Sequence, residues 1–140
     1  MSTVLWANLL VNGTVRSDEE DRRALFVHTD KLDALCTTLG IASFAGLCDS
    51  TDARFNLDEF ELPEGMASTN DHMALHGVWM ALPDAIRVLE ALLAHIQAKS
   101  VRFGLLRNQH AEVVQGLTEV LAFARGHGDG AAKFNFSIVG

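Results

Sequence analysis

Cysteine, clustered basic residues and long apolar runs are all scarce in this sequence, and each scarcity excludes a class of protein. The only two cysteines, Cys36 and Cys48, are too few for a disulfide framework or a four-cysteine metal site. No apolar run approaches the roughly 20 residues that span a bilayer, and residues 4–11 lack the flanks of a signal peptide. We therefore expect a cytoplasmic protein with two reduced thiols and no membrane partner.

Familiar catalytic and phosphate-binding motifs are also absent. Neither a Walker sequence nor a nucleophile elbow occurs. Gly126, Gly128 and Gly130 are spaced like part of a dinucleotide fingerprint, but they follow a predicted helix and precede a predicted strand, which is the reverse of the required order. We expect no cofactor and no metal, and the sequence identifies no catalytic residue, so whether the protein is an enzyme stays open.

The charge balance argues against nucleic acid as a partner. The chain has 11 lysines and arginines against 18 aspartates and glutamates, a net charge of −7, whereas binding to a phosphate backbone needs clustered cations. The one basic stretch contains Lys99, Arg102 and Arg107 with no acid among them. We interpret it as a solvated junction between two helices, able at most to bind a small anion.

Length and hydropathy predict one globular domain over residues 1–140. A chain of 140 residues is long enough to bury a substantial core, and 49% of its residues are hydrophobic. The mean hydropathy of +0.16 is high for a small domain. Because a monomer would have difficulty covering this much apolar surface, the composition predicts a homodimer.

The stretch from His76 to Lys99 is the predicted centre of the fold. His76–Leu82 is short and apolar on both faces, which is typical of a buried strand. Pro83 suits the first position of a helix, and Asp84 suits its first turn. The apolar residues that follow recur every three or four positions, so the sequence predicts an amphipathic helix from Pro83 to Lys99.

Five further elements follow from local patterns. Residues 3–11 predict a buried strand, and 133–139 a strand packed on one face only. Ser17 to Glu20 has the form of a capping box and predicts a helix that runs to Leu39, either as one bent helix or as two. Alternation over residues 53–62 predicts a half-exposed strand with a bulge at Asp58-Glu59. A final helix is predicted from Asn108 to Ala124, with Gly116 in close contact with a neighbouring element.

The order of these elements, β-α-β-β-α-α-β, predicts an α+β fold. It is the βαββα(α)β order of a ferredoxin-like sandwich with one additional helix. Such a fold has a sheet that contains antiparallel strands, with its helices on one face. The first and third strands are apolar on both faces, so we expect them at the centre of the sheet.

Acidic residues are concentrated between positions 49 and 71. This segment has a net charge of −6, whereas the other 117 residues together carry −1. Its acids alternate with apolar residues, a combination that can attract a basic partner and then bury apolar contacts. Our leading hypothesis is a non-catalytic binding or interaction module, with a basic protein as its candidate partner. The candidate partner surface consists of Asp49, Asp52, Asp58, Glu59, Phe60, Glu61 and Glu64.

The alternative hypothesis is an enzyme or small-ligand-binding domain with a pocket near Asn8, His28 and His76. These residues supply polar groups within otherwise apolar predicted elements. A metal site at Asp71, His72 and His76 would require a helix, on which the two histidines share a face. Because the pattern predicts a strand from His76 onward, we do not expect metal there.

Overall fold

A computed structural model describes residues 3–58, 62, 64–127 and 132–140. Within this part of the chain there are five strands and six α-helices. The strands are β1 (Val4–Val11), β2 (Thr14–Ser17), β3 (Cys48–Asp49), β4 (Met80–Ala81) and β5 (Lys133–Val139). The helices are α1 (Arg23–Val27), α2 (Thr29–Leu39), α3 (Thr51–Asp58), α4 (Thr69–His76), α5 (Leu82–Lys99) and α6 (His110–His127), with a short 3-10 turn at Ala45–Leu47.

The sheet is mostly antiparallel and is built around β1 and β5. Strand β1 pairs with β2 on one side and with β5 on the other, both antiparallel. The far edge of β5 pairs with β3 in parallel and with β4 in antiparallel. An α+β fold is therefore confirmed, and the pairing of the first and last strands agrees with a ferredoxin-like sandwich. The complete ferredoxin-like topology is not established.

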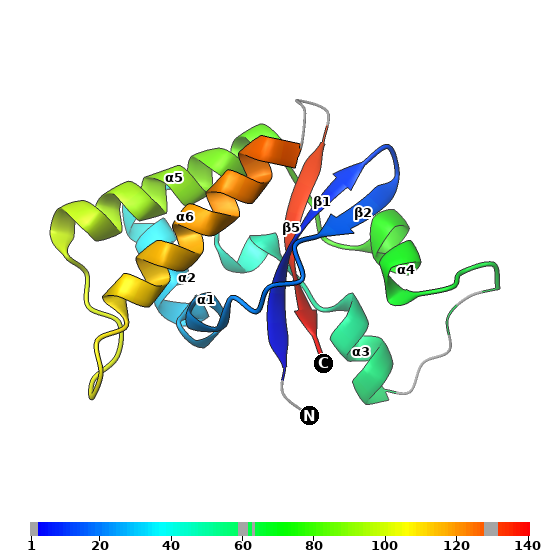
Figure 1. The fold of residues 1–140 in the computed structure, drawn as a ribbon, viewed down its shortest axis with the longest axis horizontal. Coiled ribbons are helices and arrows are strands. Elements are labelled where there is room, and N and C mark those ends of the chain that lie inside the picture. Colours follow the sequence, from blue (N-terminus) through cyan, green and yellow to red (C-terminus); the bar gives the residue numbers. More distant parts are fainter. Residues whose placement is uncertain (1–2, 59–61, 63, 128–131) are drawn as a thin grey trace.

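Helices lie on both faces of the sheet, so the prediction of helices on one face is wrong. In Figure 1, α1, α2, α5 and α6 lie to one side of β1 and β5, and α3 and α4 lie to the other. The strands are correspondingly buried on both faces. Phe134 and Phe136 of β5 are part of the main core, whereas Asn135 is in contact with Met73 of α4. The expectation that 133–139 packs on one face only is wrong for the same reason.

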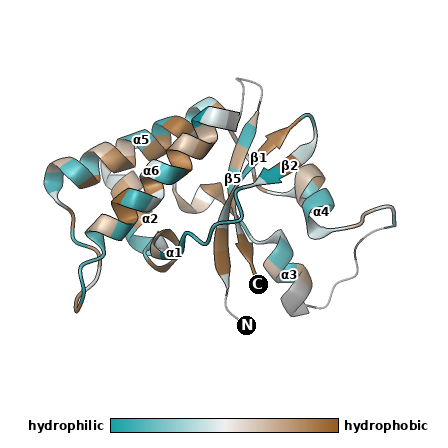
Figure 2. Cartoon of the chain, viewed as in Figure 1, coloured by the Kyte–Doolittle hydropathy of each residue, from teal (hydrophilic) through white to brown (hydrophobic). Residues whose placement is uncertain are grey.

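The main core forms where the predicted central helix packs. Leu89, Leu92 and Ile96 of α5 are completely buried, which confirms the amphipathic helix that the spacing predicts, with Pro83 in its first turn. Figure 2 shows apolar and polar residues alternating along α5 and α6, as expected for helices with one face in the core. At Gly116 of α6, a Cβ atom would lie 3.3 Å from the Leu25 side chain, so the predicted close contact is also confirmed.

The helix predicted from Ser17 to Leu39 begins later and is divided. Ser17 is the last residue of β2, where its hydroxyl donates a hydrogen bond to Asn8. The first helix, α1, begins only at Arg23, and His28 separates it from α2. The second helix ends at Gly40, which has a left-handed φ of 68°, as glycine at a helix end commonly does. Of the two alternatives left open, two helices is the one observed.

The strands predicted over residues 53–62 and from His76 to Leu82 differ from the structure. Both segments lie near the side of β5 that faces away from β1. Residues 51–58 form helix α3 instead of a strand. The predicted strand from His76 to Leu82 is reduced to Met80–Ala81, because α4 continues to His76. The first strand is central as expected, but its neighbour at the centre is β5 and not the third predicted strand. The side of β5 that faces away from β1 is paired instead with the two-residue strands β3 and β4.

Candidate functional site

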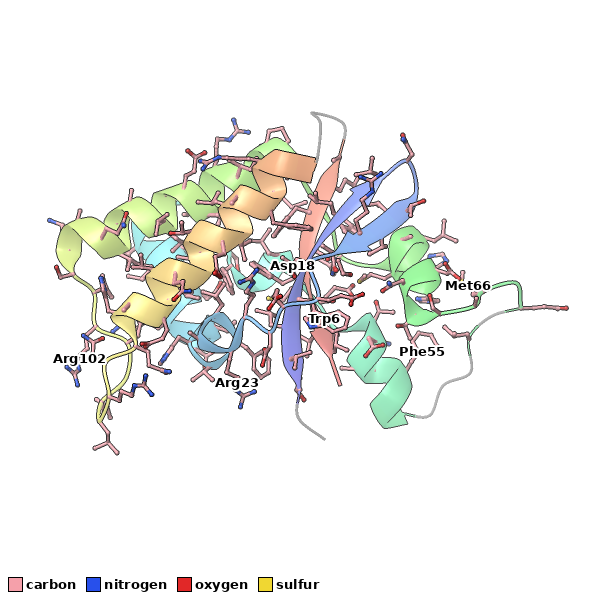
Figure 3. All side chains as sticks on the ribbon, in the orientation of Figure 1. Trp6, Asp18, Arg23, Phe55, Met66 and Arg102 are labelled. Atoms are coloured by element: carbon pink, nitrogen blue, oxygen red, sulfur yellow. The ribbon has the colours of Figure 1, made fainter. Side chains whose placement is uncertain are left out.

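Helices α3 and α4 enclose a small pocket with several polar side chains. Its volume is about 230 Å³, and it is lined by Thr51, Arg54, Phe55, His72 and His76. Residues three or four positions apart lie on one face of a helix, so each helix presents one stripe of its surface to the pocket. Figure 3 shows Phe55 beside α3 on the side nearest to α4. We refer to this site as the α3–α4 pocket.

The two histidines of the pocket lie side by side along α4, and His72 contacts the aromatic ring of Phe55 on α3. The ring centroids of His72 and His76 are 5.0 Å apart, and those of His72 and Phe55 are 4.9 Å apart in an edge-to-face arrangement. His76 is exposed and His72 is half-buried. The Nδ1 atom of His72 is inaccessible to solvent and has no hydrogen-bond partner among the described residues. An unpaired buried polar atom is costly, so a rotation of the imidazole that brought this nitrogen to a partner would recover part of that cost.

A buried carboxylate, that of Asp49, holds both helices in place. Asp49 is only 3% exposed. Its Oδ1 accepts a hydrogen bond from the backbone N–H of Thr51 at 2.9 Å, and its Oδ2 accepts one from Val78 N–H at 2.8 Å. The first bond satisfies a free N–H group at the start of α3, and the second fixes the chain just beyond α4. Asp49 therefore positions the pocket without lining it.

The neighbouring acids also bond away from the pocket. Asp52 accepts hydrogen bonds from the Thr69 hydroxyl at 2.7 Å and from Gly140 N–H at 3.2 Å. Asp71 accepts from the backbone N–H groups of Ala67 and Ser68. These carboxylates are engaged elsewhere, and no acid is among the described residues that line the pocket. The lining side chains are therefore neutral or cationic.

A polar network crosses the sheet beneath α4. The Nδ2 atom of Asn8 donates to Oδ1 of Asn135 at 2.9 Å, and Nδ2 of Asn135 donates to the backbone oxygen of Val78 at 2.8 Å. Ser17 donates to Oδ1 of Asn8. The network connects β2, β1, β5 and the segment after α4, so it helps to fix the position of α4 on the sheet.

The structure does not bring the predicted pocket residues Asn8, His28 and His76 together. Asn8 is completely buried in the polar network just described. His28 lies between α1 and α2, where its Nε2 is 2.8 Å from Oε1 of Gln109 and its ring contacts Phe103. Of the three, only His76 lines the α3–α4 pocket.

The predicted acidic surface is smaller than the sequence suggests. Asp49 is buried and Asp52 is half-buried, and both are hydrogen bonded within the protein. Glu64 is exposed. The Asp58 side chain and residues Glu59, Phe60 and Glu61 lie outside the part of the chain that the structure describes, and so does most of the predicted bulge.

The observed helix α4 meets one of the two requirements of the metal site considered at Asp71, His72 and His76. His72 and His76 do share one face of α4, as a metal pair would require. Asp71 does not join them, because its carboxylate bonds to backbone N–H groups. In the described part of the chain, no three His, Cys, Asp or Glu side chains are close enough together to hold a metal ion.

Neither cysteine contributes a reactive thiol to the site. Cys36 is completely buried and Cys48 is half-buried, and both are free. Burial, together with a smaller effect of the nearby carboxylates of Asp33 and Asp49, raises the pKa of the Cys48 thiol to about 12. Burial also raises the pKa of Cys36. Because the thiolate is the reactive form, both groups are expected to be inert near neutral pH.

Sequence reasoning missed three of the five residues that line the pocket: Thr51, Arg54 and Phe55. Their spacing of three and four residues is that of one helical face, but the alternation of Ala53, Phe55 and Leu57 favoured a strand. The signal that could have identified them is Asp49, which precedes Thr51 by two residues and is well suited to bonding the first N–H groups of a helix.

Comparison with known proteins finds no family model, no curated protein and no solved structure that this chain matches. Among the described helices, none is both long and apolar enough to cross a membrane. Function therefore has to be inferred from the residues of the chain itself.

Proposed function

We propose that the protein binds a small anionic ligand in the α3–α4 pocket, without catalysis. The observation that carries this proposal is the set of hydrogen-bond donors that line the pocket: the Arg54 guanidinium, the imidazoles of His72 and His76, and the Thr51 hydroxyl. No carboxylate is among the described residues that line it, so an anion would meet donors there without a like charge.

The chemistry of the lining favours a phosphate or carboxylate group. The Arg54 guanidinium presents several N–H donors in a planar fork that matches both groups. The imidazoles of His72 and His76 and the Thr51 hydroxyl supply additional donors. The acids nearest in sequence to these residues, Asp49, Asp52 and Asp71, are bonded elsewhere.

The size of the pocket limits the ligand. Its volume of about 230 Å³ is below the roughly 300–1,000 Å³ of sites for drug-sized molecules. We therefore expect inorganic phosphate, a small phosphate ester or a small carboxylic acid, with one edge of the ligand against the Phe55 ring.

Titration calorimetry with inorganic phosphate and with malonate tests the proposal. Arg54→Gln removes the guanidinium and should weaken binding of the preferred anion by about tenfold or more, because charge-assisted bonds contribute about 1.5–3 kcal/mol. His76→Gln should also weaken binding. Arg125→Gln is the matched control, since Arg125 is half exposed and pairs with Glu90 on another face of the molecule. If neither anion binds, or if Arg54→Gln binds as tightly as the unmodified protein, the proposal is wrong.

The second candidate function is recognition of a basic protein by the acidic segment, residues 49–71. The observation in its favour is the uneven charge distribution, a net −6 in this segment and −1 in the rest of the chain. Three of its seven acids, Asp49, Asp52 and Asp71, are used in internal hydrogen bonds. The remaining acids, Asp58, Glu59, Glu61 and Glu64, are those on which this candidate depends.

A further inference from the structure

The loop between α5 and α6, residues 100–109, carries two adjacent leucines that are almost fully exposed. Leu105 is 95% exposed and Leu106 is 102% exposed. A single exposed leucine is common on protein surfaces, but two neighbours at this level form an apolar patch. Figure 1 shows that the loop projects beyond the adjacent ends of α5 and α6, so the leucines lie on a convex tip.

The exposure of the leucines is a consequence of how the loop is held. Phe103 is completely buried, and its N–H donates to Oδ1 of Asn108 at 2.9 Å. The Arg102 side chain donates to the backbone oxygens of Gly104 and Leu105 at 2.8 and 2.9 Å. Gly104 has a φ of +104°, which glycine adopts without strain. With Phe103 anchored in the core, the next two apolar side chains are directed outward.

Cationic side chains belong to the same loop and to the elements next to it. Lys99, Arg102 and Arg107 belong to the loop and its flank, and Lys31 of α2 donates a hydrogen bond to the backbone oxygen of Arg102. The only ion pair involving these cations among the described residues joins Arg107 to Glu112 at 3.5 Å. Figure 3 shows Arg102 at the end of the molecule far from α3 and α4. Since most of the net negative charge belongs to residues 49–71, the loop end of the molecule is locally basic.

We infer that this loop docks on an anionic lipid surface. The two leucines would enter the region between the lipid headgroups, while the surrounding lysines and arginines contact phosphate and carboxylate groups. A bilayer surface can accommodate a convex apolar tip, whereas a protein partner would need a matching cavity. Contact between two copies of the tip would bring like charges together. This inference replaces the expectation of no membrane partner, and it needs no spanning helix.

Co-sedimentation with vesicles tests the inference. The vesicles consist of phosphatidylcholine alone or with about 30% phosphatidylserine, a composition that gives a negative surface potential. We expect the protein to bind only the anionic vesicles and to bind less as salt rises. The double variant Leu105→Glu, Leu106→Glu should reduce the bound-to-free ratio by about tenfold or more, because it removes both apolar contacts and adds negative charge.

Matched variants separate lipid docking from general effects. Leu75→Glu makes the same change at another leucine, 71% exposed on α4. It should leave vesicle binding unchanged when it is compared with the unmodified protein at a concentration at which light scattering gives both the same mass. Lys99→Glu with Arg107→Glu should reduce binding without changing the melting temperature, because both side chains are exposed. Arg102 is left intact because it holds the loop.

Three results would overturn the inference: no binding to phosphatidylserine vesicles, equal binding to neutral vesicles, or unchanged binding of the double leucine variant. In the first case, an acidic groove on a protein would be the better occupant of the tip.

Discussion

Asn8 of β1 and Asn135 of β5 stand directly opposite each other in the sheet, and their side chains are joined by a hydrogen bond of 2.9 Å. Both residues are completely buried. The pair lies on the α3–α4 face of the sheet, where Asn135 also contacts Val78 and Met73. This face of the sheet is therefore held by polar bonds, whereas the opposite face is held by the apolar core.

Replacing Asn8 should destabilise the protein substantially. Asn8→Ala leaves Oδ1 of Asn135 without its donor in a site that water does not reach, at a cost of about 1–3 kcal/mol. Urea denaturation measures the free energy of unfolding. Thr14→Ala, in the same sheet, is the control, because Thr14 is exposed and water can replace its hydroxyl. Equal stability of Asn8→Ala and the unmodified protein would contradict this prediction.

The elements that the sequence predicted correctly are those whose signals are local. Pro83 and the apolar spacing after it define α5, and Asn108 begins α6 by accepting hydrogen bonds from Phe103 N–H and His110 N–H. Gly40 ends α2 in a left-handed conformation. In each case the deciding interaction lies within a few residues, so the sequence pattern contains it.

The elements that were wrongly predicted depend on distant contacts. Strands β3 and β4 have two residues each and exist because they pair with β5, about 50 or more positions later in the chain. The α3–α4 pocket was missed for the same reason. The sequence spacing placed His72 and His76 on one face of a possible helix, but nothing local showed that Asp49 would bond to both Thr51 and Val78 and so set α3 beside α4.

Gly77 should tolerate no side chain. A Cβ atom there would lie 2.5 Å from the backbone oxygen of Met73 and 2.9 Å from Oδ2 of Asp49. Gly77→Ala should therefore lower the free energy of unfolding by about 1–3 kcal/mol and weaken anion binding, because it displaces the carboxylate that positions α3. The control is Gly126→Ala near the end of α6, where a Cβ meets no atom within 4 Å and alanine should stabilise the helix by up to about 1 kcal/mol. If Gly77→Ala and Gly126→Ala shift the melting temperature in the same direction, the steric explanation for Gly77 is wrong.

The thiol of Cys48 should react slowly in the folded protein. Its pKa is raised from 9.0 to about 12, chiefly by burial, so very little thiolate is present at pH 8. Reaction with Ellman's reagent at this pH should accelerate greatly when urea unfolds the chain. The same shift makes stability depend on pH, because the unfolded thiol ionises near 9.0 while the folded thiol does not. The contribution to stability is complete below pH 9 and is lost as the pH rises toward 12. Rapid reaction of both thiols with Ellman's reagent in the native protein would contradict the raised pKa of Cys48.

Self-association remains a prediction of the composition. The mean hydropathy is +0.16, and Leu75 and Val78, at and just beyond the end of α4, are 71% and 46% exposed. If they belong to a dimer interface, light scattering at high micromolar concentration should give about twice the chain mass of 15.2 kDa. Leu75→Glu should then shift the mass toward the monomer. A mass of 15.2 kDa for the unmodified protein at all concentrations would exclude a stable dimer.

Recognition of a basic protein by the acidic segment makes a prediction that differs from anion binding in the pocket. Reversal of Glu59, Glu61 and Glu64 to lysine should slow association with a basic partner, because it replaces three negative charges of the segment by positive ones. The melting temperature of the variant is measured alongside, so that a loss of stability is not mistaken for a loss of recognition. Association of the unmodified protein should also slow as salt rises, since charges more than about 8 Å apart are screened at physiological ionic strength.

The triple reversal also separates this candidate from the α3–α4 pocket. Glu64 is not among the described residues that line the pocket. If the two functions use different residues, phosphate or malonate titrations of the triple reversal should give affinities close to those of the unmodified protein. Arg54→Gln should do the opposite, weakening anion binding and leaving capture of basic proteins intact. Affinity capture with both variants, followed by quantitative comparison of the recovered proteins, measures the difference. If the triple reversal recovers the same proteins in the same amounts as the unmodified chain, the acidic segment is not a recognition surface. Anion binding would then be the remaining proposed function of this half of the molecule.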